Sequence, residues 1–201
     1  MTIWLIVPNV HKLDEQKIRR LIEAVKKSKW NYAVDFAFVW KIQDIWSMQK
    51  NWLIDIFEEY NDNDIHFYLF WKDCDNIDEN IKQAMINMTN DHFCVMDPDV
   101  VMFQTFFHRM IAWFRDEEHD VWMICPRFTI GDVAYDGGVY FKPWQIIYMI
   151  DNLSVEQYLW KWKEKFMKDR VVKVLRNCVC HYYGQIDDDM KSDNLYCDLI
   201  I

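Results

Sequence analysis

The sequence predicts one α/β domain in which helices flank a mainly parallel central sheet. Short apolar runs alternate with amphipathic segments over residues 3–96, and we find no internal repeat or low-complexity linker in the 201-residue chain. Hydrophobic residues make up 52% and charged residues 27%, which is typical of a globular protein that folds alone. We expect the domain to span residues 1–184, with an acidic extension over residues 185–201.

The first expected element is a continuous apolar run at residues 3–7, which stops at Pro8 and is typical of a strand buried on both faces. Residues 13–27 then place apolar side chains at helical spacing, with Lys and Arg on the other face. The alternation continues with strands at 33–39, 65–70 and 93–96, and with helices at 42–60, 77–88 and 101–115. Right-handed crossovers would lay these strands side by side.

The pattern changes after a short apolar strand at residues 121–125. The chain has only four glycines, and three of them lie between residues 131 and 138, so we expect a tight turn at 136–141 that enters a short strand beside a ligand. Ser154 is a good N-cap for a helix running to about Met167. Two further strands are expected at 171–175 and 178–183.

Charge and cysteine content limit the possible partners and compartments. The formal charge of −9 predicts little attraction to nucleic acid or to an anionic membrane surface, and no apolar run is long enough for an integral membrane segment. An acidic protein that handles a phosphorylated ligand needs a local positive charge, which a divalent cation would supply. Several of the six cysteines sit in apolar runs and no secretory signal opens the chain, so we expect a cytoplasmic protein with reduced thiols.

An Asp-x-Asp motif stands where such a cation would bind. Asp97-Pro98-Asp99 directly follows the expected strand at 93–96, which places it at the carboxyl end of the sheet, where open α/β folds bind ligands. Two carboxylates at this spacing suit Mn²⁺ or Mg²⁺, which would stabilise charge on a departing diphosphate. A solvated turn that caps the next helix explains the motif equally well, and Asp-x-Asp recurs at 62–64, 73–75 and 187–189.

Five short motifs follow one another along the chain: an apolar strand ending at Pro8-Asn9, then Asp97-Pro98-Asp99, Gly137-Gly138, Glu156 and His181. Their order resembles family 2 glycosyltransferases of the GT-A fold over nearly the whole chain, from about Ile3 to Tyr183. Each motif is short, so the match lies in their order. The small size is similar to that of virus-encoded members, and in that case the compartment would be the host cytoplasm.

The resemblance implies an inverting displacement in which a carboxylate takes the proton of an acceptor hydroxyl. Glu156 is the candidate base, with Asp136 and Asp151 in reserve; a helix-start glutamate with a dipole role is the alternative, since Gln157 replaces the family's second acid. His181 would be a third metal ligand or a diphosphate contact, or else a structural histidine.

The resemblance also implies a nucleotide side of the site. The family has an acid directly after the second strand, whereas this chain has Trp40, which would stack on a base or pack in the core. The polar turn at residues 73–76 and the helix after it would contact the nucleotide. An ordinary turn that caps this helix would have the same composition. The expected donor contacts are Pro8, Asn9, Trp40, Asp75, Asn76, Asn80, Asp97, Gly137 and Gly138.

The sequence therefore predicts a metal-dependent glycosyltransferase that uses a nucleoside diphosphate sugar, with a glycan, protein or lipid acceptor left open. A sugar nucleotidyltransferase is the first alternative, but residues 8–12 lack the glycine-rich loop that usually holds a triphosphate. A sugar-nucleotide-binding or assembly protein that has lost the chemistry is the second, because the family's acids are missing at Trp40 and Gln157.

Overall fold

The computed structural model describes most of the first half of the chain and the strands of the second half. The described residues are 1–8, 15–41, 51–72, 77–86, 88, 91–96, 100–101, 105–114, 121–130, 133–136, 147–151 and 171–182.

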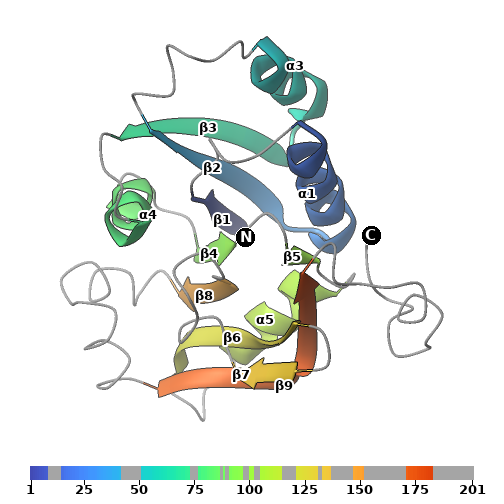
Figure 1. Cartoon of the computed structure of the whole chain (residues 1–201), viewed down its shortest axis with the longest axis vertical. Helices are drawn as coiled ribbons and strands as arrows, with labels where there is room; N and C mark the ends of the chain where they lie inside the picture. Colours follow the sequence, from blue (N-terminus) through green and yellow to red (C-terminus); the bar gives the residue numbers. More distant parts are fainter. Residues whose placement is uncertain are drawn as a thin grey trace.

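The first half forms the alternating unit that the sequence predicts (Figure 1). Its elements are β1 (Thr2–Val7), α1 (Glu15–Ser28), β2 (Ala33–Lys41), α3 (Asn51–Tyr60), β3 (Ile65–Lys72), α4 (Ile77–Ile86) and β4 (His92–Met96). The four strands are parallel and lie in the order β3-β2-β1-β4. The expected α/β class is confirmed for this part.

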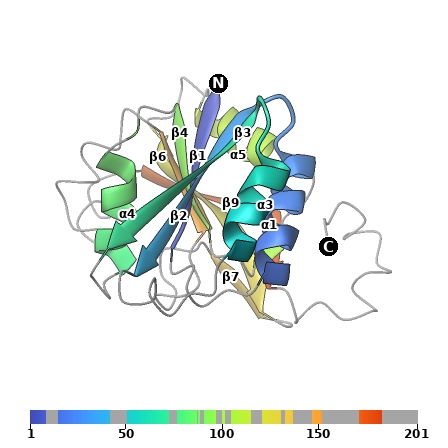
Figure 2. The same ribbon diagram turned by 90° about the horizontal axis from the view of Figure 1, so that it is seen from above.

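Helices cover both faces of this sheet. In Figure 2, α4 lies on one side of β1–β3, and α1, α3 and α5 (Phe106–Phe114) lie on the other. Alternate residues of the strands therefore enter two different layers, and every residue of β1 from Ile3 to Val7 is fully buried. On the side of α3, Phe36, Phe38, Phe57 and Phe67 stack, with Phe57 and Phe67 centroids 4.7 Å apart.

The Trp4 side chain packs in the layer between the sheet and α4. Its indole Nε1 donates a hydrogen bond to the backbone carbonyl of Ala84 at 2.9 Å, which satisfies the one polar atom of a fully buried side chain. The ring also makes edge contacts with Tyr68 and Phe70 of β3, at centroid distances of 5.1 and 5.7 Å. Small Ala37 lies in the intervening strand, so the large ring can reach across β2.

The second half extends the sheet with strands of both directions. Its strands are β5 (Val100–Val101), β6 (Val121–Ile130), β7 (Val133–Asp136), β8 (Ile147–Asp151) and β9 (Val171–Tyr182). Antiparallel β8 joins β4 to β6, β6 pairs in parallel with β9, and β5 and β7 pair antiparallel with β9 and β6. β6 and β9 run in the direction of β1, so the sheet is mainly parallel, as expected.

Several expected boundaries are wrong, and non-local pairing explains them. Val100–Val101 is a strand and not the start of a helix, because it pairs with β9. Residues 171–182 form one strand where two were expected. β6 continues through Pro126, which cannot donate to a ladder, and the register shifts directly after this residue.

Other expectations fall outside the described residues. These are the helix at 154–167, the part of the expected turn from residue 137 onward, and the acidic extension from residue 185. No helix in the described part of the chain is long and apolar enough to cross a bilayer.

Candidate functional site

The strand order reverses between β1 and β4. From β1 the chain proceeds outward to β2 and β3, and it then returns to place β4 on the other side of β1. In open α/β sheets, ligands bind at the carboxyl ends of the strands at such a reversal. Ile6 is level with Val95 in the ladder, so the last residues of β1 and β4, Val7 and Met96, lie at nearly the same level.

A second ladder joins His181 to the same region. The two-residue strand β5 begins directly after Asp99, and it pairs Val100 with Tyr182 and Val101 with His181. On its other side His181 is opposite Thr129 of β6. The backbone thus brings the end of β9 beside the residue that follows the Asp-x-Asp motif, which the sequence alone did not show.

The metal site at Asp97, Asp99 and His181 stays a prediction. Asp97 and Asp99 lie outside the described residues, and for His181 the backbone position alone is given. The described residues contain no group of three or more His, Cys, Asp or Glu side chains that could hold a metal ion.

Two of the three candidate base residues, Asp136 and Asp151, lie in described strands. Glu156 lies outside the described residues, and so do Gly137 and Gly138. Asp136 is the last residue of β7 and is opposite Arg127 of β6, which is in turn opposite Val179 of β9. Asp151, a reserve candidate, ends β8 opposite His92 and is therefore level with the amino end of β4. This position is at the wrong end of the parallel strands for a base beside Asp97.

The carboxyl ends of β2 and β3 include three residues that the sequence analysis did not single out: Lys41, Trp71 and Lys72. β2 and β3 both extend two residues beyond their expected ends, and the extensions pair Trp40 with Trp71 and Lys41 with Lys72. These positions lie at the same carboxyl edge as Pro8. A repeated Trp-Lys at the ends of two apolar runs was the signal that could have revealed them.

The remaining expected contacts cluster around the start of α4. Asn80 is the fourth residue of this helix, which begins soon after the carboxyl end of β3. Asn9, Asp75 and Asn76 lie outside the described residues. The nucleotide contact of Asn80 stays a prediction.

The competing Asp62-Asn63-Asp64 motif is structural. The backbone amide of Asp64 donates to Asp62 Oδ1 at 2.8 Å, and Asp64 Oδ2 accepts from Lys29 Nζ at 3.2 Å. The motif lies in the turn before β3, at the amino end of the strands and away from the carboxyl ends where the site is expected.

Cys94 is also excluded from the chemistry, although it is only three residues from Asp97. It is fully buried in the core, and burial raises the pKa of its thiol far above the usual range. A thiol that stays protonated is a poor nucleophile and a poor metal ligand.

Comparisons with solved structures place the fold. A mannosyltransferase from Pyrobaculum calidifontis in complex with GDP-Man and Mn²⁺ is similar at a TM-score of 0.60 and 10% identity, over 93% of this chain and 57% of that one. TarS from S. aureus in complex with UDP-GlcNAc is similar at a TM-score of 0.57 and 11% identity, over 96% of this chain and 60% of that one. The 4-diphosphocytidyl-2C-methyl-D-erythritol synthase from Anaerococcus prevotii is similar at a TM-score of 0.56 and 11% identity, over 98% of this chain and 95% of that one.

These similarities establish a GT-A-like fold, in which a central sheet with four adjacent parallel strands is flanked by helices. This chain spans less than two thirds of the two transferase structures but nearly the whole synthase. No family model matches the sequence, and no curated protein sequence is similar to it. The fold is thus defined by structure and not by sequence relationship.

Proposed function

We propose that this chain is a glycosyltransferase that moves a sugar from a nucleoside diphosphate sugar to an acceptor hydroxyl, with a divalent cation. One observation carries the proposal: the Asp-x-Asp motif directly follows β4 at the reversal of strand order, and the next two residues pair with the end of β9 at His181. Neighbouring structures of the same fold hold GDP-Man with Mn²⁺ or UDP-GlcNAc, which supports the donor class.

The residues fit a hard cation. Asp97, Asp99 and His181 offer two carboxylates and one imidazole, a donor set suited to Mn²⁺ and, through the carboxylates, to Mg²⁺. When bound, the cation would neutralise diphosphate charge that the formal −9 of the chain otherwise repels.

The protein must also accept a proton from the acceptor. Glu156 is the proposed general base, and Asp136 is the reserve. Arg127 is opposite Asp136 in the ladder between β6 and β7.

The nucleotide would lie toward the ends of β2 and β3. Trp40 and Trp71 supply aromatic surface for a base, while Lys41 and Lys72 supply positive charge where the family has an acid. Pro8, Asn9, Asp75, Asn76 and Asn80 would complete the donor contacts, with Gly137-Gly138 beside the transferred sugar.

The direct test is donor binding with and without cation. Thermal unfolding should shift upward with UDP- or GDP-sugar plus Mn²⁺, by about 2.7 kcal/mol in unfolding free energy when ligand is at a hundred times its Kd. Slow donor hydrolysis should accompany binding. Cation-dependent binding without any hydrolysis or transfer would instead support the degenerate sugar-nucleotide-binding alternative.

A sugar nucleotidyltransferase remains the second candidate, because this chain covers 95% of the synthase structure and a smaller share of the transferases. Residues 8–12, which follow β1, contain no glycine, which disfavours triphosphate binding. Incubation with nucleoside triphosphate and sugar 1-phosphate separates the two: release of pyrophosphate would favour the nucleotidyltransferase.

A further inference from the structure

Trp30 is an exposed tryptophan held in an unusual backbone conformation. Trp30 is 67% exposed, and its φ of 55° lies in the left-handed region that bulky residues avoid. The turn between α1 and β2 is fixed by two backbone hydrogen bonds, from Lys29 N to Val25 O at 2.8 Å and from Tyr32 N to Lys29 O at 3.0 Å. The sequence places a large apolar ring in solvent at a position where glycine would be less strained.

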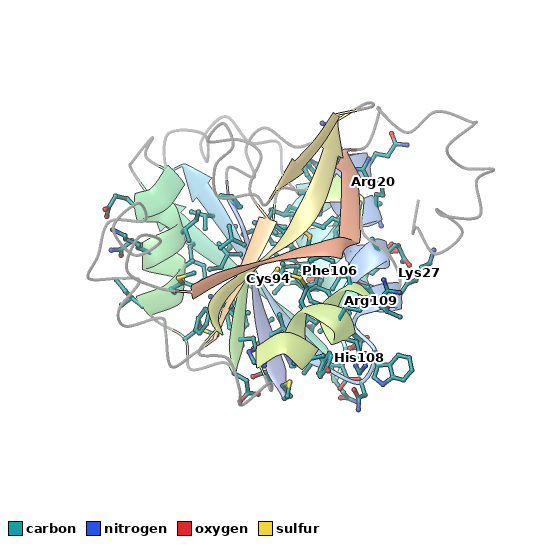
Figure 3. The ribbon with its side chains drawn as sticks, turned by 90° about the horizontal axis from the view of Figure 1, so that it is seen from below. Arg20, Lys27, Cys94, Phe106, His108 and Arg109 are labelled. Atoms are coloured by element: carbon teal, nitrogen blue, oxygen red, sulfur yellow. The ribbon has the colours of Figure 1, made fainter. Side chains whose placement is uncertain are left out.

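The Trp30 ring contacts a histidine, and exposed basic residues lie close to both partners in the sequence. The Trp30 ring lies against His108 of α5, with centroids 5.8 Å apart and planes tilted by 32°. Lys27, His108 and Arg109 are all exposed and lie on one side of the molecule in Figure 3. We call Lys27, Trp30, His108 and Arg109 the Trp30 patch.

The local charge runs against that of the whole protein. Residues 15–30 carry six Lys or Arg side chains and two Glu, although the chain has a formal charge of −9. At the rim, Lys26 Nζ lies 5.2 Å from the Tyr60 ring centroid, and Lys29 pairs with Asp64. Asp62 and Asp64 are acids of the neighbouring turn, at the same end of the strands.

We propose that the Trp30 patch docks on an anionic lipid bilayer. An amphipathic ring flanked by cations fits the bilayer interface, where the ring enters the headgroup region and the cations meet lipid phosphate and carboxylate groups. This partner fits better than nucleic acid, since a single exposed ring offers no row of stacking platforms for successive bases. The expected strength is that of a weak, reversible peripheral contact.

The patch and the proposed active site lie at opposite ends of the parallel strands. Trp30 precedes β2, at the amino ends, whereas Pro8 and Asp97 follow β1 and β4 at the carboxyl ends. Docking would therefore leave the donor site facing away from the bilayer. Bilayer binding needs no donor or cation and can be tested apart from the proposed transferase activity.

The test is flotation of the full chain with vesicles of phosphatidylcholine alone or mixed with phosphatidylserine. We expect binding to the mixed vesicles only, weakened by added salt. Lys27→Glu should reduce binding about thirty-fold, because each unit of charge near an anionic bilayer changes affinity roughly five-fold. Trp30→Gly should reduce it severalfold without loss of folding, since glycine accepts the positive φ.

Matched variants outside the Trp30 patch serve as controls. Lys82→Glu on α4 makes the same charge change on the opposite side of the sheet, and Ile54→Ala on α3 removes another exposed apolar side chain. Both should bind as the parent does. The proposal is overturned if mixed vesicles do not bind, or if patch and control variants lose binding equally. A dimer in sedimentation that Trp30→Gly dissociates would also overturn it, by assigning the patch to a second copy.

Discussion

The two ends of the parallel strands carry similar residues with different tasks. At the amino end, Asp64 pairs with Lys29, and Asp91 Oδ2 accepts a hydrogen bond from the backbone amide of Thr2 at 2.7 Å. At the carboxyl end, Asp97 and Asp99 follow a strand at the reversal of strand order. The same Asp-x-Asp pattern is therefore a structural turn at one end and a proposed cation site at the other.

Helix direction explains the difference. The helix between two parallel strands begins near their carboxyl ends and ends near their amino ends, so partial positive charge gathers at the first and partial negative charge at the second. α1 follows this rule, with Glu15 in its first turn and Lys26 and Lys27 in its last. A diphosphate with its cation suits the carboxyl end, and lysines suit the amino end.

The largest expected effect is at the proposed base. Glu156→Gln should lower the rate of sugar transfer at least about a hundredfold, roughly 2.7 kcal/mol in activation free energy, because the amide cannot take the acceptor proton. Donor binding with Mn²⁺ should be retained. Asp136→Asn is the matched comparison. A larger loss of transfer rate in that variant would show that Asp136, and not Glu156, is the base.

The next effect concerns stability and not chemistry. Trp4→Phe removes the indole hydrogen bond and leaves the buried Ala84 carbonyl without it, so we expect a loss of about 2 kcal/mol in unfolding free energy. Urea denaturation measures this, with donor binding by the folded fraction unchanged. An unchanged midpoint would show that the Trp4 contact does not hold α4 in place.

A smaller effect is expected at His181. His181→Ala should weaken Mn²⁺-dependent donor binding about tenfold, since two carboxylates remain, and should weaken binding with Mg²⁺ less, because that ion prefers oxygen ligands. Titration calorimetry with each cation gives the two ratios. Equal losses with both ions would indicate a structural histidine.

The smallest effect is at the amino end. Asp64→Asn weakens a surface ion pair with Lys29, for which we expect less than about 1 kcal/mol in unfolding free energy and no change in donor binding. Thermal melts at low and high salt would measure it. A changed affinity for donor would contradict the assignment of donor binding to the carboxyl ends of the strands alone.

Local patterns were enough to predict the first half of the fold. Each strand from β1 to β3 is an apolar run followed by an amphipathic helix, and β4 is a further apolar run, so the existence of these strands depends on neighbours in sequence. The second half depends on partners far along the chain: Val100–Val101 is extended because β9 lies beside it, and antiparallel β8, which was not predicted, joins β4 to β6.

The same reasoning applies to the site. The position of Asp97-Pro98-Asp99 after β4 followed from a local pattern, as did the exclusion of Asp62-Asn63-Asp64. The pairing of Val100–Val101 with β9 at His181, and the pairing of Lys41 with Lys72, became known only from the registers of two ladders. Spacing along the sequence carries no information on such registers.

The most direct measurement is cation-dependent donor binding by the Asp97→Ala, Asp99→Ala double variant, compared with Asp62→Ala, Asp64→Ala. The account predicts that the first variant folds but loses the Mn²⁺-dependent rise in melting temperature with UDP- or GDP-sugar, whereas the second keeps it despite a lower starting value. Retention of the full shift by the first variant would contradict a cation site at the end of β4.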